Sequence, residues 1–255
     1  MIAEGDRVLL QGADGRKHLI RAKGEMMDVR GLGVVDGSVI RAASYGDTMS
    51  IGGHKFVILR PSISDTISLL ERKAQMMIPK DSYALPMYLD VSTGSRVIEG
   101  GAGSGAMTIV LLKSVFPTGA VYSYETREDH ASIAKRNIEM SGLDSCWHLK
   151  MADICNANLE KDVDAVLLDI PNPWDAVDNA VGALKAGGYL CCYVPNTNQL
   201  NDTVKKMREA GLSEILSFEN LQREMVVHDG GVRPSFDMLG HTGYIAIGRK
   251  VPRQV

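Results

Sequence analysis

The segment Glu99-Gly100-Gly101-Ala102-Gly103-Ser104-Gly105 constrains the architecture of this chain more than any other. It follows a run of strand-forming residues at 96–99 and precedes a helix-forming run at 106–113. Glycines allow the backbone to turn sharply and to approach a ligand closely, and the first turn of a helix presents unpaired N–H groups. The segment therefore predicts a ligand-binding loop between a strand and a helix, with a tight turn that binds nothing as the alternative.

Strand-like and helix-like segments alternate from about residue 63 onward. The expected strands cover 96–99, 120–124, 147–151, 163–168, 188–194 and 244–247, and the expected helices cover 106–113, 127–140 and 201–210. Gly142 and Gly211 follow two of these helices, and glycine commonly ends a helix. This alternation is typical of an α/β fold with a parallel, doubly wound, Rossmann-like sheet.

Short β-prone runs alternate with glycine turns over the first sixty residues. Asp14-Gly15 predicts a type I′ hairpin turn, and we expect Val39-Ile40, which follows Asp36-Gly37, to form a strand. The last run ends before Pro61, because proline cannot continue a central strand. We therefore expect a small all-β, barrel-like domain over residues 1–62 and an α/β domain over residues 63–255.

The composition of the 255 residues is that of a globular chain, with 45% hydrophobic and 23% charged residues. No apolar run approaches the roughly 18 residues that a membrane span requires, so we expect no membrane contact. The acidic start does not resemble a signal peptide, and the four cysteines lack the spacing of a metal site or a disulfide framework. We expect a cytoplasmic protein with reduced thiols and no metal ion.

The net charge of -3, taken alone, argues against a nucleic-acid partner. The acidic residues are concentrated between 81 and 200, however, and both ends of the chain lean basic. A polyanion could therefore contact the ends of the chain, although ordinary scatter of surface charge is the alternative. Candidate phosphate contacts are Arg16, Lys17, Arg21, Lys23 and Arg233.

Two classes of cofactor fit the glycine segment. Gly101-x-Gly103-x-x-Ala106 satisfies the loose dinucleotide fingerprint, so an NAD-dependent oxidoreductase stays open. The acid before the glycines, in Glu99-x-Gly101-x-Gly103-x-Gly105, resembles instead the first motif of S-adenosylmethionine (SAM) methyltransferases. The residues expected to bind the amino-acid end of SAM are Glu99, Gly101, Gly103, Ser104 and Gly105.

Two further acids follow successive expected strands. Glu125 lies about twenty positions beyond the glycines and suits ribose hydroxyls with either cofactor. Asp153 follows the strand at 147–151 and suits the N6 amine of an adenine. Each acid alone is compatible with a solvated loop, but acids at three strand ends together favour a nucleoside cofactor.

Leu167-Leu168-Asp169-Ile170-Pro171-Asn172-Pro173-Trp174 ends the fourth strand of the Rossmann-like part. Ligands of open α/β sheets bind at this edge, so we expect Asp169 to lie over the glycine segment. The two prolines stiffen the turn, and Trp174 offers a flat surface. A proline-rich turn around a buried tryptophan without a ligand is the alternative.

The order Glu-x-Gly-x-Gly-x-Gly and then Asp-x-Pro-x-Pro-Trp resembles the tRNA (adenine-N1)-methyltransferase family, which modifies position 58 of the T-loop. The likeness covers nearly the whole chain and is greatest to the archaeal branch, which also acts at position 57. Further stretches agree with it, namely Arg72-Lys73-Ala74-Gln75, Pro79-Lys80-Asp81, Tyr124-Glu125-x-Arg127, Tyr193-Val194-Pro195-Asn196 with Gln199, Arg233-Pro234 and His241-Thr242-Gly243-Tyr244. Two departures are Met77-Ile78, where the family usually has an aromatic residue, and Gly100 in place of a small aliphatic residue.

The resemblance implies SAM as the methyl donor, tRNA as the partner and a homotetramer. It implies that Asp169 is both catalytic and cofactor-binding, that Trp174 and Arg233 bind the substrate, and that Glu125 and Asp153 bind SAM. Protein isoaspartate methyltransferases share the first motif but lack the second. A non-catalytic RNA-binding subunit is a further alternative, against which the intact glycine segment, Glu125 and Asp169 argue.

Overall fold

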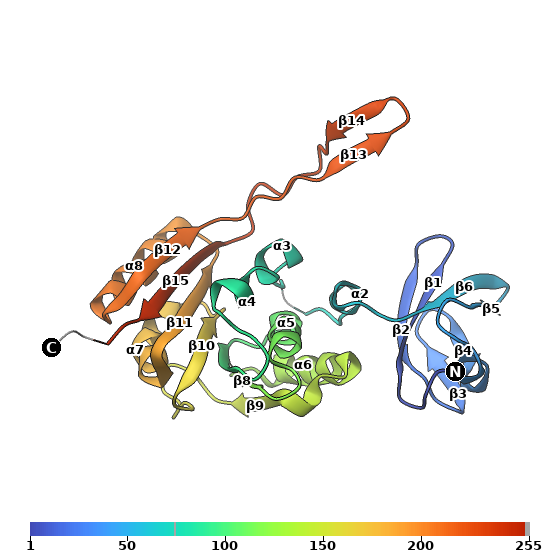
Figure 1. Cartoon of the computed structure of the whole chain (residues 1–255), viewed down its shortest axis with the longest axis horizontal. Coiled ribbons are helices and arrows are strands. Elements are labelled where there is room, and N and C mark those ends of the chain that lie inside the picture. Colours follow the sequence, from blue (N-terminus) through green and yellow to red (C-terminus); the bar gives the residue numbers. More distant parts are fainter. Residues whose placement is uncertain (74, 253–255) are drawn as a thin grey trace.

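The computed structural model describes residues 1–73 and 75–252, which form two sheet systems and a projecting arm (Figure 1). Ala74, which belongs to one of the family-like stretches, lies outside the described residues. The amino-terminal part is a four-stranded antiparallel sheet in the order β2-β1-β6-β5 together with the hairpin β3-β4. Its elements are β1 (Arg7–Gly12), β2 (Lys17–Arg21), β3 (Met26–Val29), β4 (Gly33–Asp36), α1 (Gly37–Ala42), β5 (Thr48–Ile51) and β6 (His54–Leu59).

Two local expectations for this part are wrong. Val39-Ile40 lies in helix α1 and not in a strand, because the Asp36 side chain accepts a hydrogen bond from the Ser38 amide and caps the helix. The turn at Asp14-Gly15 is not type I′, which requires positive φ at two successive residues. Only Gly15 is left-handed there, with φ +80°, and the loop closes between Gly12 and Arg16.

The larger sheet has seven strands in the order β12-β15-β11-β10-β7-β8-β9. β7, β8, β9, β10 and β11 are parallel to their neighbours within this group, as the α/β pattern predicts. β15 is antiparallel to both β11 and β12, so the sheet is mixed and not wholly parallel. The strands are β7 (Arg96–Gly100), β8 (Ala120–Glu125), β9 (Trp147–Met151), β10 (Val163–Leu168), β11 (Leu184–Val194), β12 (Leu212–Phe218) and β15 (Tyr244–Lys250).

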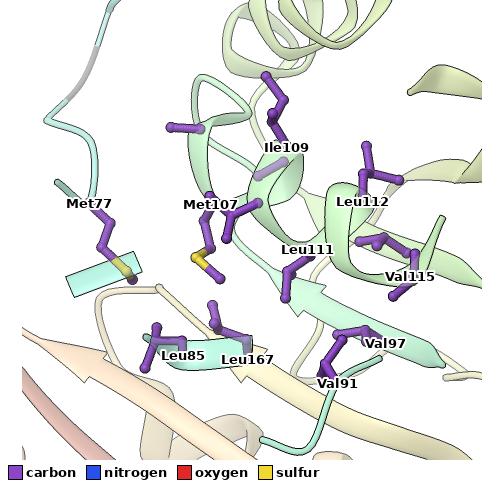
Figure 2. Packing of buried hydrophobic residues seen from close by; sticks show 14 of the residues in the cluster. Met77, Leu85, Val91, Val97, Met107, Ile109, Leu111, Leu112, Val115 and Leu167 are labelled. Atoms are coloured by element: carbon purple, nitrogen blue, oxygen red, sulfur yellow. The ribbon is translucent and has the colours of Figure 1, made fainter. Parts of the chain in front are cut away.

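Helices cover both faces of this sheet, and alternate residues of each strand enter opposite cores. On β10, Leu167 packs with α5, whereas Val166 and Leu168 pack with α7 and α8. Figure 2 shows the first core, in which Leu167 of the sheet and Met107 of α5 lie close to Leu85. The helices are α2 (Ile63–Ser68), α3 (Pro79–Ser82), α4 (Leu85–Tyr88), α5 (Ala106–Val115), α6 (Glu128–Ser141), α7 (Pro173–Ala183) and α8 (Thr197–Glu209), with a 3-10 turn η1 (Asp144–Cys146). No helix in the described part of the chain is long and apolar enough to cross a membrane.

Residues 219–243, here called the arm, leave the sheet between β12 and β15 and project from the body of the molecule (Figure 1). The arm ends in a hairpin of β13 (Met225–His228) and β14 (Gly231–Pro234). Large apolar side chains along it are exposed to solvent, namely Leu221, Met225, Val227, Val232, Phe236 and Leu239. The arm therefore carries an apolar surface that its own chain leaves uncovered.

Candidate active site

The glycine segment and the Asp169 loop touch at the carboxyl ends of β7 and β10. The Gly101 amide donates to the Tyr124 carbonyl oxygen at 2.9 Å, and the Asp169 amide donates to the Gly100 carbonyl oxygen at 2.9 Å. Gly101 has φ +87°, and a Cβ atom at this position would lie 2.2 Å from the Asp169 carbonyl oxygen. Only glycine permits this contact, so the structure places Asp169 against the glycine segment as expected.

Glu99 lies fully buried beneath the glycine segment. Its Oε2 atom accepts hydrogen bonds from Thr108 Oγ1 at 2.7 Å and from Ser123 Oγ at 2.5 Å. Its Oε1 atom is buried and has no hydrogen-bond partner among the described residues. Burial raises the pKa of Glu99 to about 7, although the hydrogen bonds from Ser123 and Thr108 lower it. A buried acid with one unused acceptor atom is a site at which a cation would be stabilised.

Glu125 ends β8 and organises the backbone around the same loop. Its Oε2 atom accepts from the Gly103 amide at 3.1 Å, and its Oε1 atom accepts from the amides of Thr126 and Arg127 at 2.9 and 3.0 Å. The Glu125 side chain is only 7% exposed. It therefore anchors the glycine segment directly, and a carboxylate has capacity for a further donor.

Asp153 and Asp169 are both accessible to solvent. Asp153 follows β9, where its Oδ1 atom accepts from the Cys155 amide at 2.9 Å. Asp169 is exposed as a residue, but desolvation of its carboxyl by the surrounding protein raises its pKa to about 6. An accessible carboxyl that stays ionised above this pH is suited to accept a hydrogen bond from a ligand.

Trp174 lies in the first turn of α7, which begins with Pro173, and is half-buried. The loop between Asp169 and Trp174 is held by the first turn of α8, because Gln199 Nε2 donates to the Pro171 carbonyl oxygen at 2.9 Å. Arg233 lies elsewhere, on β14 of the arm, with its guanidinium 4.3 Å from the centre of the Phe236 ring. Within one chain, the structure does not bring Arg233 together with Asp169 (Figure 1).

The Ser104 position depends on a residue that the sequence did not single out. Asn137 is buried on α6, and its Nδ2 atom donates to the carbonyl oxygens of Ser104 at 2.8 Å and of Glu71 at 3.0 Å. Thr108 and Ser123, the partners of Glu99, were also missed. For Thr108 and Ser123 the available signal was a polar residue in an otherwise apolar segment, which indicates a buried hydrogen bond. Asn137 lies among charged residues of α6 and carried no such signal.

Met77 and Ile78 precede Pro79-Lys80-Asp81, in the stretch where the family usually has an aromatic residue, and Met77 is the buried one of the two. Its side chain is 5% exposed and packs into the core with Met107 and Leu85 (Figure 2). Met77 therefore presents no surface on which a base could stack. No cluster of three or more metal-ligating side chains occurs in residues 1–73 and 75–252.

The mixed seven-stranded sheet, with an acid-led glycine segment opposite an Asp-x-Pro-x-Pro-Trp loop, is that of a SAM-dependent methyltransferase. A SAM-dependent O-methyltransferase from Thermotoga maritima superposes with a TM-score of 0.86 and 36% identity, over 100% of this chain and 96% of that one. A tRNA (m1A58) methyltransferase from Aquifex aeolicus superposes with a TM-score of 0.77 and 26% identity, over 98% and 99% of the two chains. The fold class is confirmed, and SAM, not NAD, is the cofactor.

The family model of the tRNA methyltransferase complex GCD14 subunit matches residues 56–233, and the chain belongs to this family. The chain is 32% identical to the tRNA (adenine(57)-N(1)/adenine(58)-N(1))-methyltransferase of Methanocaldococcus jannaschii, over 96% of this chain and 95% of that protein. It is 29% identical to the tRNA (adenine(58)-N(1))-methyltransferase of Thermus thermophilus, over 95% and 96% of the two. The resemblance seen in the sequence is confirmed, and the protein is a methyltransferase.

Proposed function

We propose that this protein transfers a methyl group from SAM to N1 of adenine 58 in the T-loop of tRNA, and also to adenine 57. Membership of the tRNA methyltransferase family supports the substrate, and the archaeal relative named for both positions supports the second site. The contact between the Gly101 backbone and the Asp169 loop carries the assignment within the structure, because it joins a cofactor loop to an accessible carboxyl.

The residues around the glycine segment fit SAM. The unpartnered Oε1 atom of Glu99 suits the cationic amino-acid end, and a Cβ at Gly103 would meet open space. In the proposal, Glu125 holds the ribose and Asp153 holds the adenine N6 amine, while Gly101, Gly103, Ser104 and Gly105 shape the loop. When bound, SAM supplies an electrophilic methyl group on a sulfonium ion.

The protein need not supply a nucleophile for this reaction. The lone pair of adenine N1 lies in the plane of the ring, so the main task of the protein is to hold the base in line, which contributes about 7–11 kcal/mol in well-oriented systems. Asp169 accepts a hydrogen bond from the N6 amine of the target base. Its negative charge also stabilises the positive charge that develops on the base.

The target base must leave its stack, at a cost of about a few kcal/mol. We propose that Trp174 offsets part of this cost by stacking on the base, since it is half-buried five positions after Asp169. Arg233 contacts phosphate in this proposal. Because Arg233 lies on the arm, it would act on the RNA beyond the reacting base or at the site of another copy of the chain.

We propose that residues 1–62 form a tRNA-binding domain. A groove of about 1000 Å³ separates its strands β2 and β3 from α6 of the methyltransferase domain, residues 63–255. Its basic side chains outnumber its acidic ones, with Lys17, Arg21, Lys23, Arg30 and Arg136 against Asp28, Glu71 and Glu139. Lys17, Arg21 and Lys23, three of the four basic residues that the sequence suggested in this domain, line the groove, and Arg16 does not. Lys17 is also paired with Asp65 and Lys23 with Glu25.

We further propose that copies of the chain cover the apolar arm in a homotetramer, because exposed apolar side chains in a contiguous segment mark protein interfaces. The mass in solution, measured by light scattering, tests this proposal. A monomeric mass at micromolar concentration would refute it.

The reaction is tested by incubating the protein with methyl-labelled SAM and unmodified tRNA, digesting the RNA and identifying the labelled nucleoside. We expect label in 1-methyladenosine at position 58 and, in a tRNA with adenine at 57, at that position too. A tRNA with guanosine at both positions is the matched control. Label on an oxygen atom or on protein carboxylates, or no label on RNA, would overturn the proposal.

A further inference from the structure

Lys80 and Asp81 on α3 form a buried ion pair that methyl transfer as proposed above does not use. Lys80 Nζ lies 2.8 Å from Asp81 Oδ1, and the two side chains are 8% and 0% exposed. Removing two charges from water is costly, so a buried pair is compatible with a stable fold only where further hydrogen bonds satisfy both partners. The partners of Lys80 and Asp81 therefore indicate what the pair is for.

These partners come from the two ends of the arm. Thr242 Oγ1 accepts from Lys80 Nζ at 2.6 Å and donates to Asp81 Oδ2 at 2.7 Å. Lys80 Nζ also donates to the Asn220 carbonyl oxygen at 2.6 Å, and Asn220 Nδ2 donates back to the Lys80 carbonyl oxygen at 3.2 Å. The Lys80–Asp81 pair is thus hydrogen-bonded to both ends of the arm, at Asn220 where the chain leaves the sheet and at Thr242 where it returns.

The same pair reaches the strand beside Asp169. Tyr193 OH donates to Asp81 Oδ2 at 3.3 Å. Tyr193 follows Cys192, which is paired with Leu168 in the parallel strands β11 and β10, so Tyr193 and Asp169 occupy adjacent positions at the edge of the sheet. The returning end of the arm packs on the Tyr193 ring so closely that a Cβ at Gly243 would lie 2.3 Å from its Cζ atom.

We propose that Lys80 and Asp81 are positioning residues for methyl transfer. Through Asn220 and Thr242 they hold the two ends of the arm, here called the arm base, against Tyr193. They thereby fix the edge of the sheet beside Asp169. The kinetic part of this inference rests on the proposed function. The structural part, a fixed arm base, does not. Neither side chain is hydrogen-bonded to the glycine segment, so the pair acts on the placement of the target base and not on SAM binding.

The most selective variant is Thr242→Val, which removes the bridging hydroxyl with little change in shape and leaves both charges present. Thr242→Ser restores the hydroxyl and serves as the rescue variant. Thr203→Val is the matched control, because the Thr203 hydroxyl is also buried but has no hydrogen-bond partner among the described residues. Each variant is assayed below its melting temperature for SAM dissociation constant, for kcat and KM with tRNA, and for amide hydrogen exchange.

We expect Thr242→Val to lower kcat about tenfold, because small displacements of reacting groups have effects of this order or larger. Its SAM affinity stays that of the wild type, while amides at 193–196 and at both ends of the arm exchange faster and those of β7 and α5 do not. Thr242→Ser and Thr203→Val behave like the wild type. Unchanged exchange at the arm base, or an unchanged kcat in Thr242→Val, would overturn the proposal. If the wild type itself fails to methylate tRNA, the proposed function fails, whereas the exchange result still decides whether the pair fixes the arm.

Discussion

Replacement of Glu99 by glutamine is expected to make the unliganded protein more stable at alkaline pH while it weakens SAM binding. Burial raises the pKa of this acid from 4.5 to about 7. The folded protein therefore binds more protons than the unfolded chain between these values, and stability contributed by this group is lost as the pH rises through about 7. At 1.36 kcal/mol per pKa unit, the full loss above pH 8 is about 3 kcal/mol.

The amide of glutamine has no charge to lose and still accepts from Thr108 and Ser123. Its Nε2 atom replaces the unpartnered Oε1 atom, which adds a cost of about 1–3 kcal/mol that is the same at every pH. The informative quantity is therefore the difference between the unfolding free energies of Glu99→Gln and the wild type as a function of pH. This difference should rise by about 2.5 kcal/mol in favour of the variant from pH 5 to pH 8.5.

The assay is urea unfolding of both proteins at several pH values without SAM, with Glu224→Gln as a control at an exposed carboxylate. Repeating it with SAM at about 100 times its dissociation constant should stabilise the wild type by about 2.7 kcal/mol and the variant by less. If this difference in unfolding free energy does not change with pH, or changes in the opposite direction, burial does not raise the pKa of Glu99. Equal stabilisation by SAM would refute its role in binding.

Four further results are expected. Because burial raises the pKa of Asp169 to about 6, kcat/KM for tRNA should rise with pH through about 6 and then level off. The variant Asp169→Asn should lose most of the activity and also this pH dependence. A wild-type profile that is flat from pH 5 to 8 would contradict the role of the carboxylate. In urea unfolding, Gly101→Ala should be less stable than Gly103→Ala by about 2 kcal/mol or more. Both glycines have positive φ, but only a Cβ at Gly101 would lie against a carbonyl oxygen. Equal losses of unfolding free energy in the two variants would argue against the contact between Gly101 and Asp169. Trp174→Ala should raise KM for tRNA or lower kcat about tenfold, leaving the SAM dissociation constant unchanged, because a stacked base is stabilised by about 1–3 kcal/mol, and a loss confined to SAM binding would remove it from the RNA site. Arg30→Ala should weaken tRNA binding and reduce the slope of log affinity against log salt by about one, and a slope equal to that of the wild type would exclude the groove as a phosphate contact.

The sequence predicted those strands and helices that local sequence signals specify and that the tertiary structure does not override. The strand at 163–168 and the strand-glycine-helix unit around Gly101 formed where they were expected, because glycine spacing and apolar runs are local signals. The contact of Asp169 with this unit followed from the rule that ligand sites of α/β sheets lie at the carboxyl edge.

Other features depend on contacts between distant segments. Val39-Ile40 has a β-prone composition, but the Asp36 cap places it in a helix. The direction of β15 could not be predicted, since an apolar run has the same pattern in parallel and antiparallel strands. The hydrogen-bond partners of Glu99 come from helix α5 and strand β8, and the sequence contains no local signal that Thr108 and Ser123 meet there. The arm hairpin was not predicted, although Asp229-Gly230 between two β-prone runs is a local hairpin signal that was overlooked.

The close packing of Gly101 against the Asp169 backbone has a consequence for any search for altered variants of this protein. A substitution at Gly101 displaces the Asp169 backbone directly, since a Cβ at Gly101 would lie 2.2 Å from the Asp169 carbonyl oxygen. Loss of activity in such a variant therefore says nothing about which loop was damaged. Selection for a new methyl donor and selection for a new acceptor base would act on the same few atoms, and we expect the two specificities to change together.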